Sequence, residues 1–206
     1  TIKMAVEKVR LLEPYDEITV PVENKKALVI GGGVAGMDAA ERMGDKGFET
    51  YLVERDPSIG GRMAKLDKTF PTTDCSICIL GPKMVDTARN PNVEIISYAD
   101  VTKVEGWIGN YTVHITKKPR YVTEECTGCE VCEEVCPVVM KDEFEEGLDV
   151  HKAIYKQFPQ AVPDQFVIDM DYCIKCGLCQ EKCREEGPDA IDFDMEPEDI
   201  TLNVDT

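Results

Sequence analysis

The sequence predicts an α/β protein into which a smaller α+β unit is inserted. Three observations carry this prediction. An apolar run, of the kind found in buried strands, leads directly into the glycine-rich turn Gly31–Gly36. Two cysteine runs of equal spacing lie further along the chain, between Cys126 and Cys183. A last segment, 200–204, alternates apolar and polar residues and is typical of a strand that rejoins the first unit.

Composition limits what the chain can be. Its 206 residues, 43% of them hydrophobic, can bury a core in one domain or in two small ones. There is no apolar run of about 18 residues, so we expect no membrane span, and the charged N-terminal residues are unlike a signal peptide. The net charge of −17 disfavours partners such as nucleic acid. The acidity serves either solubility or docking to basic patches on redox partners.

Residues 1–26 are expected to form an N-terminal connector. Apolar residues separated by charges predict a short helix over 1–12. Pro14 ends this helix, and Pro21 punctuates an extended segment. The segment carries no chemistry, and we expect it to pack against a neighbouring domain or subunit.

Residues 27–118 predict the first part of a Rossmann-like, dinucleotide-binding domain. The apolar run Ala27–Ile30 is typical of a buried parallel strand. A helix is expected over 34–46, and a second strand over 48–54. The turn contains G-x-G-x-x-G, and the acid Glu54 ends the second strand, which is the context that the dinucleotide fingerprint requires.

Each residue of the fingerprint has a physical task. Gly31 makes the tight turn, Gly33 lets the backbone approach a pyrophosphate, and Gly36 lets the helix pack on the strand. The pyrophosphate sits on the helix N-terminus, and Glu54 takes the ribose hydroxyls. A turn of this type that binds nothing is the alternative. The predicted cofactor-binding residues here are Gly31, Gly32, Gly33, Val34, Ala35, Gly36, Glu54 and Arg55.

The rest of this unit alternates helix and strand signals. Residues 82–90 predict a short helix with Pro82 in its first turn. Residues 93–97 predict a third strand. Segments 101–105 and 111–116 predict a hairpin around the turn Gly109-Asn110.

The stretch after Glu54 favours one dinucleotide. It continues through Arg55 to Gly60-Gly61-Arg62-Met63, and this pattern resembles flavoproteins of the two-dinucleotide-binding-domain type, such as relatives of thioredoxin reductase and amine oxidases. The resemblance implies FAD, with Gly61, Arg62 and the adjoining Met63 at its phosphates. It also implies a backbone contact to adenine near Val101, on the first strand of a β-meander. A solvated surface arginine is the alternative for Arg62.

The two cysteine runs have the spacing of bacterial-type [4Fe–4S] ligand sets. In two-cluster ferredoxins the fourth cysteine of each run ligates the cluster of the other run. We therefore assign the first cluster to Cys126, Cys129, Cys132 and Cys183, and the second to Cys173, Cys176, Cys179 and Cys136. Ten cysteines without a signal peptide indicate metal ligation in a reducing compartment, so we expect a cytoplasmic protein. Zinc ligands or disulfides are the alternatives.

The loops around the cysteines complete an α+β dicluster unit over 119–193. Gly128 and Gly177 lie inside the cysteine runs, where a positive φ is useful. Two short strands are expected at 165–168 and 190–193, with an ordered loop over 151–163. Residues 194–206 are then expected to return to the first unit.

Cys75 and Cys78 form a separate C-x-x-C pair. One interpretation makes them ligands of a third cluster that is completed by cysteines outside this chain. A second makes them a redox disulfide beside a flavin. A third makes them two buried structural thiols.

Several long motifs resemble the A subunit of heterodisulfide reductase, an iron–sulfur flavoprotein family. They are the glycine turn, the segments 54–72, 74–84, 118–122 and 152–163, and both cysteine runs. The resemblance covers nearly the whole chain from about Met4. It implies a dicluster ferredoxin inserted into an FAD-binding domain, and it favours cluster ligation by Cys75 and Cys78.

The resemblance also implies an activity and partners. The family is thought to split electron pairs on FAD, with one electron going to ferredoxin and the other to the CoM-S-S-CoB disulfide in methanogenesis. The implied partners are other heterodisulfide reductase subunits, a hydrogenase or formate dehydrogenase electron-input subunit, and ferredoxin. A later Gly-Asp motif for the flavin is absent from the sequence, so we expect the isoalloxazine side of the site to be made elsewhere. A dicluster carrier without enzyme activity, or a quinone-interacting oxidoreductase subunit, is the alternative.

Overall fold

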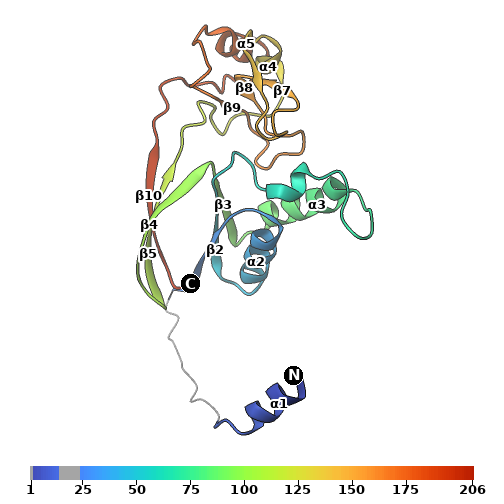
Figure 1. Ribbon diagram of the computed structural model, residues 1–206. Helices are drawn as coiled ribbons and strands as arrows, with labels where there is room; N and C mark the ends of the chain where they lie inside the picture. The colour runs from blue at the N-terminus through green and yellow to red at the C-terminus, as the bar shows by residue number, and fades with distance from the viewer. Residues whose placement is uncertain (1, 14–23) are drawn as a thin grey trace.

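The computed structural model describes residues 2–13 and 24–206. Helix α1 (Ile2–Arg10) confirms the short N-terminal helix, and none of its residues is buried. The predictions for Pro14 and Pro21 lie outside the described residues. Figure 1 shows the rest as a layered α/β part and a cysteine-rich part, which bears helices α4 and α5.

A three-stranded parallel sheet forms the middle layer of the α/β part. Its strands are β1 (Lys26–Ile30), β2 (Glu49–Glu54) and β3 (Val93–Ser97), in the order β1-β2-β3. Side chains of the central strand β2 point alternately to the two faces of the sheet, and both faces are covered, so the strand is buried on both sides. Leu52 packs toward the helices, whereas Tyr51 and Val53 pack toward the second sheet.

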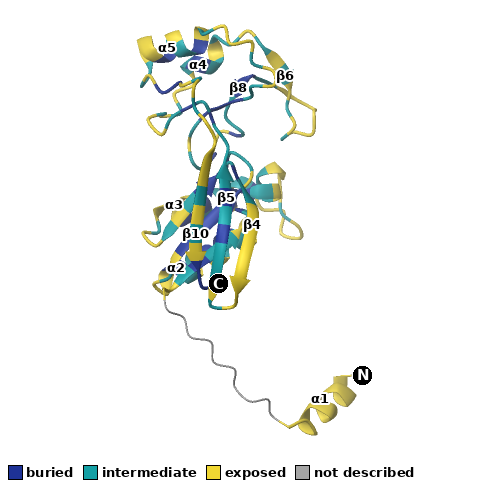
Figure 2. Cartoon of the chain, turned by 90° about the vertical axis from the view of Figure 1, so that its left-hand side faces the viewer, coloured by how far each residue is buried: buried dark blue, intermediate teal, exposed yellow. Residues whose placement is uncertain are grey.

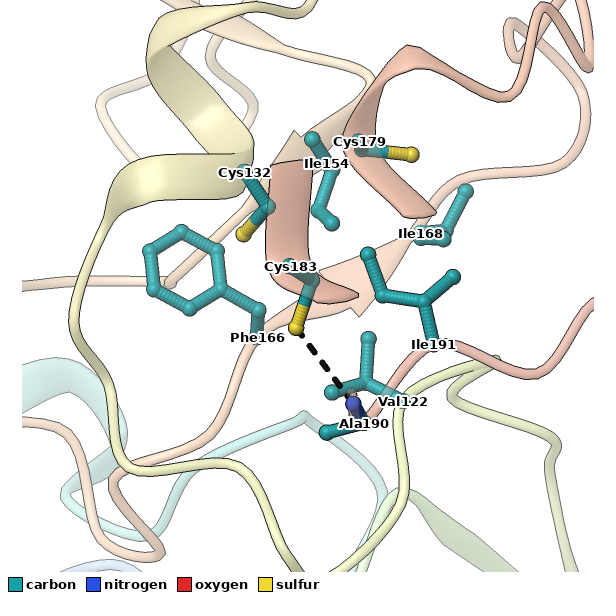
Figure 3. Close-up of a cluster of buried hydrophobic side chains, with 9 residues drawn as sticks. All are labelled: Val122, Cys132, Ile154, Phe166, Ile168, Cys179, Cys183, Ala190 and Ile191. Carbon is teal, nitrogen blue, oxygen red and sulfur yellow. Dashed lines mark hydrogen bonds between the residues drawn. The ribbon is translucent and has the colours of Figure 1, made fainter. Parts of the chain in front are cut away.

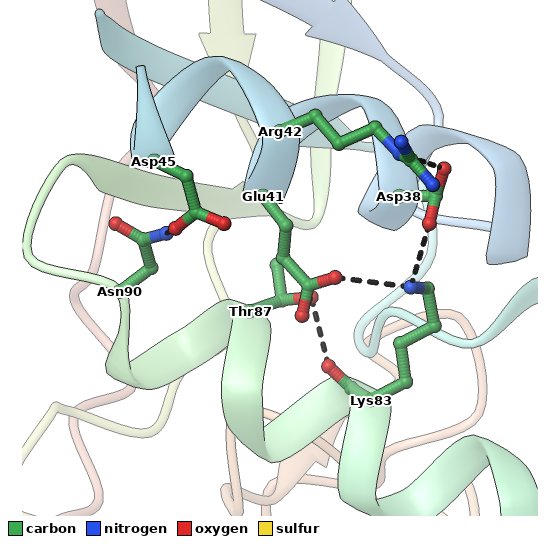
Figure 4. A network of polar contacts seen from close by, with 7 residues as sticks. All are labelled: Asp38, Glu41, Arg42, Asp45, Lys83, Thr87 and Asn90. Carbon is green, nitrogen blue, oxygen red and sulfur yellow. Dashed lines mark hydrogen bonds and ion pairs between the residues drawn. The ribbon is translucent and has the colours of Figure 1, made fainter. Parts of the chain in front are cut away.

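Two helices cover one face of the parallel sheet. Helix α2 (Val34–Asp45) and helix α3 (Ser76–Arg89) bury Met37, Leu80 and Met84 against it. Figure 4 shows a polar network that also joins these helices. In it, Lys83 Nζ lies 3.0 Å from Asp38 Oδ1 and 3.0 Å from Glu41 Oε2, and these carboxylates raise the pKa of Lys83.

Helix α3 corrects one prediction. The helix begins at Ser76, so Pro82 lies inside it rather than in its first turn. Two local interactions hold the earlier start: Cys75 Sγ accepts a hydrogen bond from Cys78 N, and Ser76 Oγ donates one to Met63 O. Burial of Leu80, which is fully enclosed, offsets the backbone hydrogen bond that proline cannot donate.

Gly81 precedes this proline within the helix, and it offers a stability test. Apart from its own helix and its chain neighbours, a Cβ added at Gly81 would meet no atom within 4 Å. Alanine loses less backbone entropy on folding than glycine, but a Cβ on the residue before a proline crowds the proline ring in the helical conformation. Gly81→Ala is therefore expected to change the free energy of unfolding by less than about 1 kcal/mol. Denaturant unfolding of the two proteins measures the difference, and a loss of about 3 kcal/mol or more would contradict the open environment of Gly81.

A second, antiparallel sheet covers the other face. It consists of β4 (Ala99–Trp107), β5 (Asn110–Lys117) and β10 (Glu198–Val204), in the order β10-β5-β4. The predicted hairpin and the predicted return strand are both confirmed, since β10 pairs with β5 over its whole length. Val113, Ile115 and Val204 bury their side chains against the parallel sheet. Figure 2 shows the solvent-facing, largely exposed β4 edge of this sheet.

The cysteine-rich part lies between β5 and β10 in the chain. Its elements are α4 (Val131–Glu134), β6 (Val139–Lys141), β7 (Val150–Lys152), β8 (Ile154–Tyr155), β9 (Val167–Ile168) and α5 (Leu178–Glu186). Strands β6 and β7 form one two-stranded sheet, and β8 and β9 form another.

Two predictions for this part are wrong in detail. The strand expected at 165–168 is present as β9 and pairs with β8, but 190–193 forms no strand, because only Ile191 makes an isolated bridge there, to Val122. Residues 151–163, expected as a loop, supply most of β7 and all of β8. The second error has a physical cause: Ile154 is almost fully buried beside Phe166, and this packing favours a short strand where the sequence shows no regular alternation.

Candidate cofactor and metal sites

A cavity of about 850 Å³ lies where a dinucleotide would bind in a Rossmann-like sheet. The carboxyl ends of β1 and β2 and the first residues of β4 line it. An extra wall comes from η1, a short 3-10 helix at Gly61–Lys65. The predicted cofactor residues that line the cavity are Gly31, Glu54, Arg55, Gly61, Arg62 and Val101.

The glycine turn fits close approach of a pyrophosphate. Gly31 has a φ of +100°, and a Cβ at Gly36 would lie 1.8 Å from the carbonyl oxygen of Gly31. A Cβ at Gly33, by contrast, would meet nothing within 4 Å. Gly33 is also the N-cap of α2, whose N-terminal N–H groups suit an anion. Gly32, Gly33, Val34, Ala35 and Gly36 form this turn and helix start beside the cavity rather than lining it.

The second glycine pair is built onto the first turn. Gly60 N donates a hydrogen bond to Gly32 O at 2.8 Å, and a Cβ at Gly61 would lie 3.1 Å from Gly33 Cα. This contact places Arg62 at the cavity wall. The side chain of Met63 packs instead against the core between the helices and the sheet.

The two cysteine runs adopt the same backbone conformation. In the first run Gly128 and Glu130 have φ values of +66° and +68°. At the same positions of the second run, Lys175 and Gly177 have φ values of +54° and +80°. The predicted positive φ of Gly128 and Gly177 is confirmed. Each run therefore presents its cysteines from a loop of the same shape.

The second predicted ligand set surrounds one apolar pocket. Cys136, Cys173, Cys176 and Cys179 all line this pocket, although Cys136 belongs to the first run. Burial raises the pKa of the Cys179 thiol to about 11, with smaller contributions from Cys173, Cys136 and Cys176. The four residues proposed for one cluster are thus brought together around one space.

The first set is brought together only in part, around Cys132, and its member Cys129 is exposed. Burial raises the pKa of Cys132 to about 12, and the next contributions come from Cys126 and Cys183. Figure 3 shows the Cys179 sulfur directed away from the sulfurs of Cys132 and Cys183. In the same view, Ala190 N donates a hydrogen bond to Cys183 Sγ, with a nitrogen–sulfur distance of 3.3 Å. The eight cysteines of the two runs are free thiols.

This donor set fits iron–sulfur clusters. Within residues 2–13 and 24–206, no three His, Cys, Asp or Glu side chains converge on the position of a single metal ion. A cubane needs a wider arrangement, because each of its four irons takes a separate thiolate. Backbone N–H donors to Cys173 and Cys183 suit thiolate ligands, whose cluster potential such bonds tune.

Two family models match the two parts of the chain. Residues 122–187 match the model of the 4Fe-4S dicluster domain, and residues 29–94 match the NAD(P)-binding Rossmann-like domain. The predicted fold class, a Rossmann-like domain combined with a dicluster ferredoxin-type domain, is confirmed.

Relatives in methanogens match the whole chain. The A subunit of the H(2):CoB-CoM heterodisulfide,ferredoxin reductase of Methanothermobacter marburgensis is 57% identical over 206 residues, which are 100% of this chain and 31% of the relative. One of the iron-sulfur A subunits of the CoB--CoM heterodisulfide reductase of Methanopyrus kandleri is 61% identical over 98% of this chain and 30% of its own length. Over nearly its whole length, this chain is thus similar to part of the heterodisulfide reductase A subunit.

The similarity to the heterodisulfide reductase A subunit has a defined extent. The chain spans about 30% of the length of the curated relatives it matches. A solved L-proline dehydrogenase from P. horikoshii aligns with 49% of this chain at 23% identity and a TM-score of 0.39, which adds nothing to the fold described above. Among the described residues, no helix is both long enough and apolar enough to cross a membrane.

Cys75 and Cys78 are joined by a disulfide at the start of α3. Both residues are exposed, so the interpretation as buried structural thiols is wrong. Their predicted role as ligands of a third cluster, which the resemblance to the heterodisulfide reductase A subunit favours, remains a prediction. Their exposure leaves the pair accessible to groups from outside the chain.

Sequence reasoning missed several residues around the cavity. Asp100 and Ala99 line it from β4, and Glu146 reaches it from the cysteine-rich part. Glu146 Oε1 lies 3.1 Å from Lys65 Nζ, in a largely exposed ion pair at the cavity edge. No local pattern marks Glu146, because it lies in a run of acids that is typical of a solvated loop.

Glu54 is the charged residue most tightly bound into the glycine turn. It is buried, and Gly32 N donates to its Oε2 at 2.6 Å while Asp56 N donates to its Oε1 at 3.0 Å. Glu54→Ala is expected to lower flavin content and to reduce stability by about 1.5–3 kcal/mol, because it removes hydrogen bonds to a charged acceptor. Extractable flavin and denaturant unfolding measure the two effects. Full flavin content in the variant would show that Glu54 does not contribute to cofactor binding.

Proposed function

We propose that this chain is the electron-relay part of a heterodisulfide-reductase-type iron–sulfur flavoprotein, in which electrons pass between FAD and two [4Fe–4S] clusters. One observation carries the proposal. The cavity at the glycine turn and the two crossed cysteine sets belong to one chain, and the loop between them is hydrogen-bonded to both parts. Ile59 N donates to Val162 O at 3.0 Å, next to the bond from Gly60 to the glycine turn.

The residues of the chain would divide the work. The glycine turn and the N-terminus of α2 would hold the pyrophosphate, and Glu54 would face the ribose. The crossed cysteine sets would hold the clusters. When bound, the flavin supplies two-electron chemistry and the clusters accept single electrons. The chain's own part would be to bind, orient and insulate these groups, since the described residues that line the cavity include no serine, threonine, cysteine or histidine.

The choice of FAD over a nicotinamide cofactor rests on the second glycine pair. The contact of Gly61 with Gly33 brings Arg62 to the same end of the cavity as the glycine turn. A guanidinium at this position suits a dinucleotide phosphate. Both dinucleotides carry such a phosphate, so the choice of FAD depends on the resemblance of the stretch after Glu54 to flavoproteins.

The wider role proposed here follows the names of the relatives. It comprises electron bifurcation from hydrogen or formate toward ferredoxin and CoM-S-S-CoB in methanogenesis, within a complex with other heterodisulfide reductase subunits and an electron-input hydrogenase or formate dehydrogenase. The names of the relatives support the heterodisulfide and ferredoxin parts. The eight cysteines in cluster-ligand spacing support a reducing location, the cytoplasm, whereas the Cys75–Cys78 disulfide does not.

An anaerobic reductive titration of the full complex tests the relay. Flavin absorbance and cluster electron paramagnetic resonance are followed together as reductant is added. We expect both signals to respond and to re-equilibrate with each other after the reductant is exhausted. Clusters that are reduced and reoxidised with no flavin signal at any stage would favour a dicluster carrier instead.

A further inference from the structure

The two parts of the chain meet at a loop of the cofactor site. Residues 56–61 follow Glu54 and end at the glycine pair that contacts the glycine turn. On the opposite side, Val162 N donates to Ser58 Oγ at 2.8 Å, and Gln157 Oε1 accepts from Ser58 N at 3.2 Å. The cofactor loop 56–61 is therefore held from the cysteine-rich part as well as from the glycine turn.

Arg120 makes a second contact with the same loop. Its Nη2 donates to Pro57 O, in the cofactor loop 56–61, and to Ser97 Oγ at 2.8 Å, at the end of β3. The main chain of Arg120 belongs to the cysteine-rich part, because Arg120 O accepts from Ile168 N at 3.0 Å. One residue thus has its backbone in one part and its side chain in the other.

Arg120 also lies at the entrance to the first ligand set. The next residues, Tyr121 and Val122, pack into the core that contains Cys132 and Cys183. Thr123 O accepts from Cys126 N at 3.1 Å, so a short, hydrogen-bonded segment leads from the guanidinium to the first ligand.

The cation is enclosed, and no carboxylate of the described residues pairs with it. Arg120 is 5% exposed, and its Nη1 has no hydrogen-bond partner within 2–13 and 24–206. Its side chain lies 5.7 Å from the centroid of the Tyr98 ring, which is a favourable distance for a cation over an aromatic face. Burial lowers the pKa of Arg120 to about 10, so the group stays charged at neutral pH.

We propose that Arg120 is a positioning residue that locks the first cluster's ligand set against the cofactor loop 56–61 and supplies that cluster with a buried positive charge. This inference rests on the proposed function. An apolar side chain of similar length would fill the same space without burying an unpaired donor, so packing alone does not account for the cation. A positive charge near a cluster favours its reduced form, which is the more negative one.

Three variants of the full-length subunit in its complex separate charge from geometry. Arg120→Met removes both the charge and the planar fork, whereas Arg120→Lys keeps the charge and loses the fork. Arg184→Met is the matched control, because Arg184 follows the ligand Cys183 but its side chain is 64% exposed. Cluster midpoint potentials and the rate of electron exchange between flavin and clusters are measured for each.

We expect Arg120→Met to lower the potential of the first cluster, with about a tenfold fall in the equilibrium constant for its one-electron reduction, or about 59 mV. Arg120→Lys is expected to keep this potential but to slow electron exchange, as Arg120→Met does. Arg184→Met is expected to change neither quantity, because solvent screens an exposed charge.

Wild-type potentials and exchange rates in Arg120→Met would overturn the inference. If that variant does not assemble, Arg120→Lys decides, since wild-type exchange in it would remove the positioning role. Failure of the proposed function would give a different result, because the wild-type complex would then contain no flavin. The potential of the first cluster can be measured in that case too, and it tests the charge independently.

Discussion

Replacing Cys183 with alanine is expected to remove the first cluster, although Cys183 belongs to the second cysteine run. Cys183 contributes to the raised pKa of the Cys132 thiol, in the first ligand set. Cys136, from the first run, lines the pocket of the second ligand set. A cubane that loses one of four thiolates is destabilised as a unit. Iron is therefore expected to fall from about eight to about four atoms per chain. Iron analysis with electron paramagnetic resonance measures the loss.

The matched variant is Cys136→Ala, which is expected to remove the second cluster and leave the first. Spectra of Cys183→Ala are expected to match those of Cys129→Ala, and spectra of Cys136→Ala those of Cys176→Ala. The opposite pairing would show that each run holds its own cluster. Wild-type iron in both Cys129→Ala and Cys176→Ala would contradict the ligand assignment altogether.

Alanine at two glycines of the same turn is expected to have different effects, on stability at Gly36 and on flavin binding at Gly33. In Gly36→Ala the new Cβ would lie 1.8 Å from Gly31 O, a backbone atom that cannot move freely. We expect a loss of about 3 kcal/mol or more in the free energy of unfolding. In Gly33→Ala the Cβ enters open space, and the φ of −73° suits alanine. That variant is expected to fold normally but to bind flavin about tenfold more weakly or worse.

Denaturant unfolding and flavin titration on the same preparations measure these two effects. Gly81→Ala serves as the control, because its Cβ also meets open space but lies away from the cavity. It is expected to keep full flavin binding. Unchanged flavin affinity in Gly33→Ala would move the pyrophosphate away from the glycine turn.

The strands of the two larger sheets were the most predictable part of the fold. The alternation after Pro197 matches the burial pattern of β10. The run Ala27–Ile30 does form a parallel strand, but the prediction that it is buried is wrong beyond Ala27, because β1 is an edge strand and Ile30 is 64% exposed. Pro82 misled the prediction of α3, because its local preference for a helix start was overridden by the burial of Leu80 and Met84. The pairing of β9 with β8 was missed because neither two-residue strand has a measurable period.

At the candidate site, the cysteine spacing predicted the ligand sets, but the sequence indicated only half of the left-handed backbone positions. Glycine marks two of these positions, 128 and 177. The corresponding positions of the other run carry Lys175 and Glu130, which also have positive φ. These residues adopt positive φ because the loop shape requires it, at a cost of about 1 kcal/mol each. Arg120 could not be recognised from sequence, since its importance arises from contacts with residues as distant as Pro57.

Iron, acid-labile sulfide and flavin per chain, measured on the anaerobically purified complex, test the central claim most directly. Two cubanes and one flavin predict about eight irons, about eight sulfides and one FAD for the sites described here. About four further irons would be the expected result if Cys75 and Cys78 ligate a third cluster. Eight irons without any flavin in the intact complex would contradict the electron relay and leave a ferredoxin-type carrier.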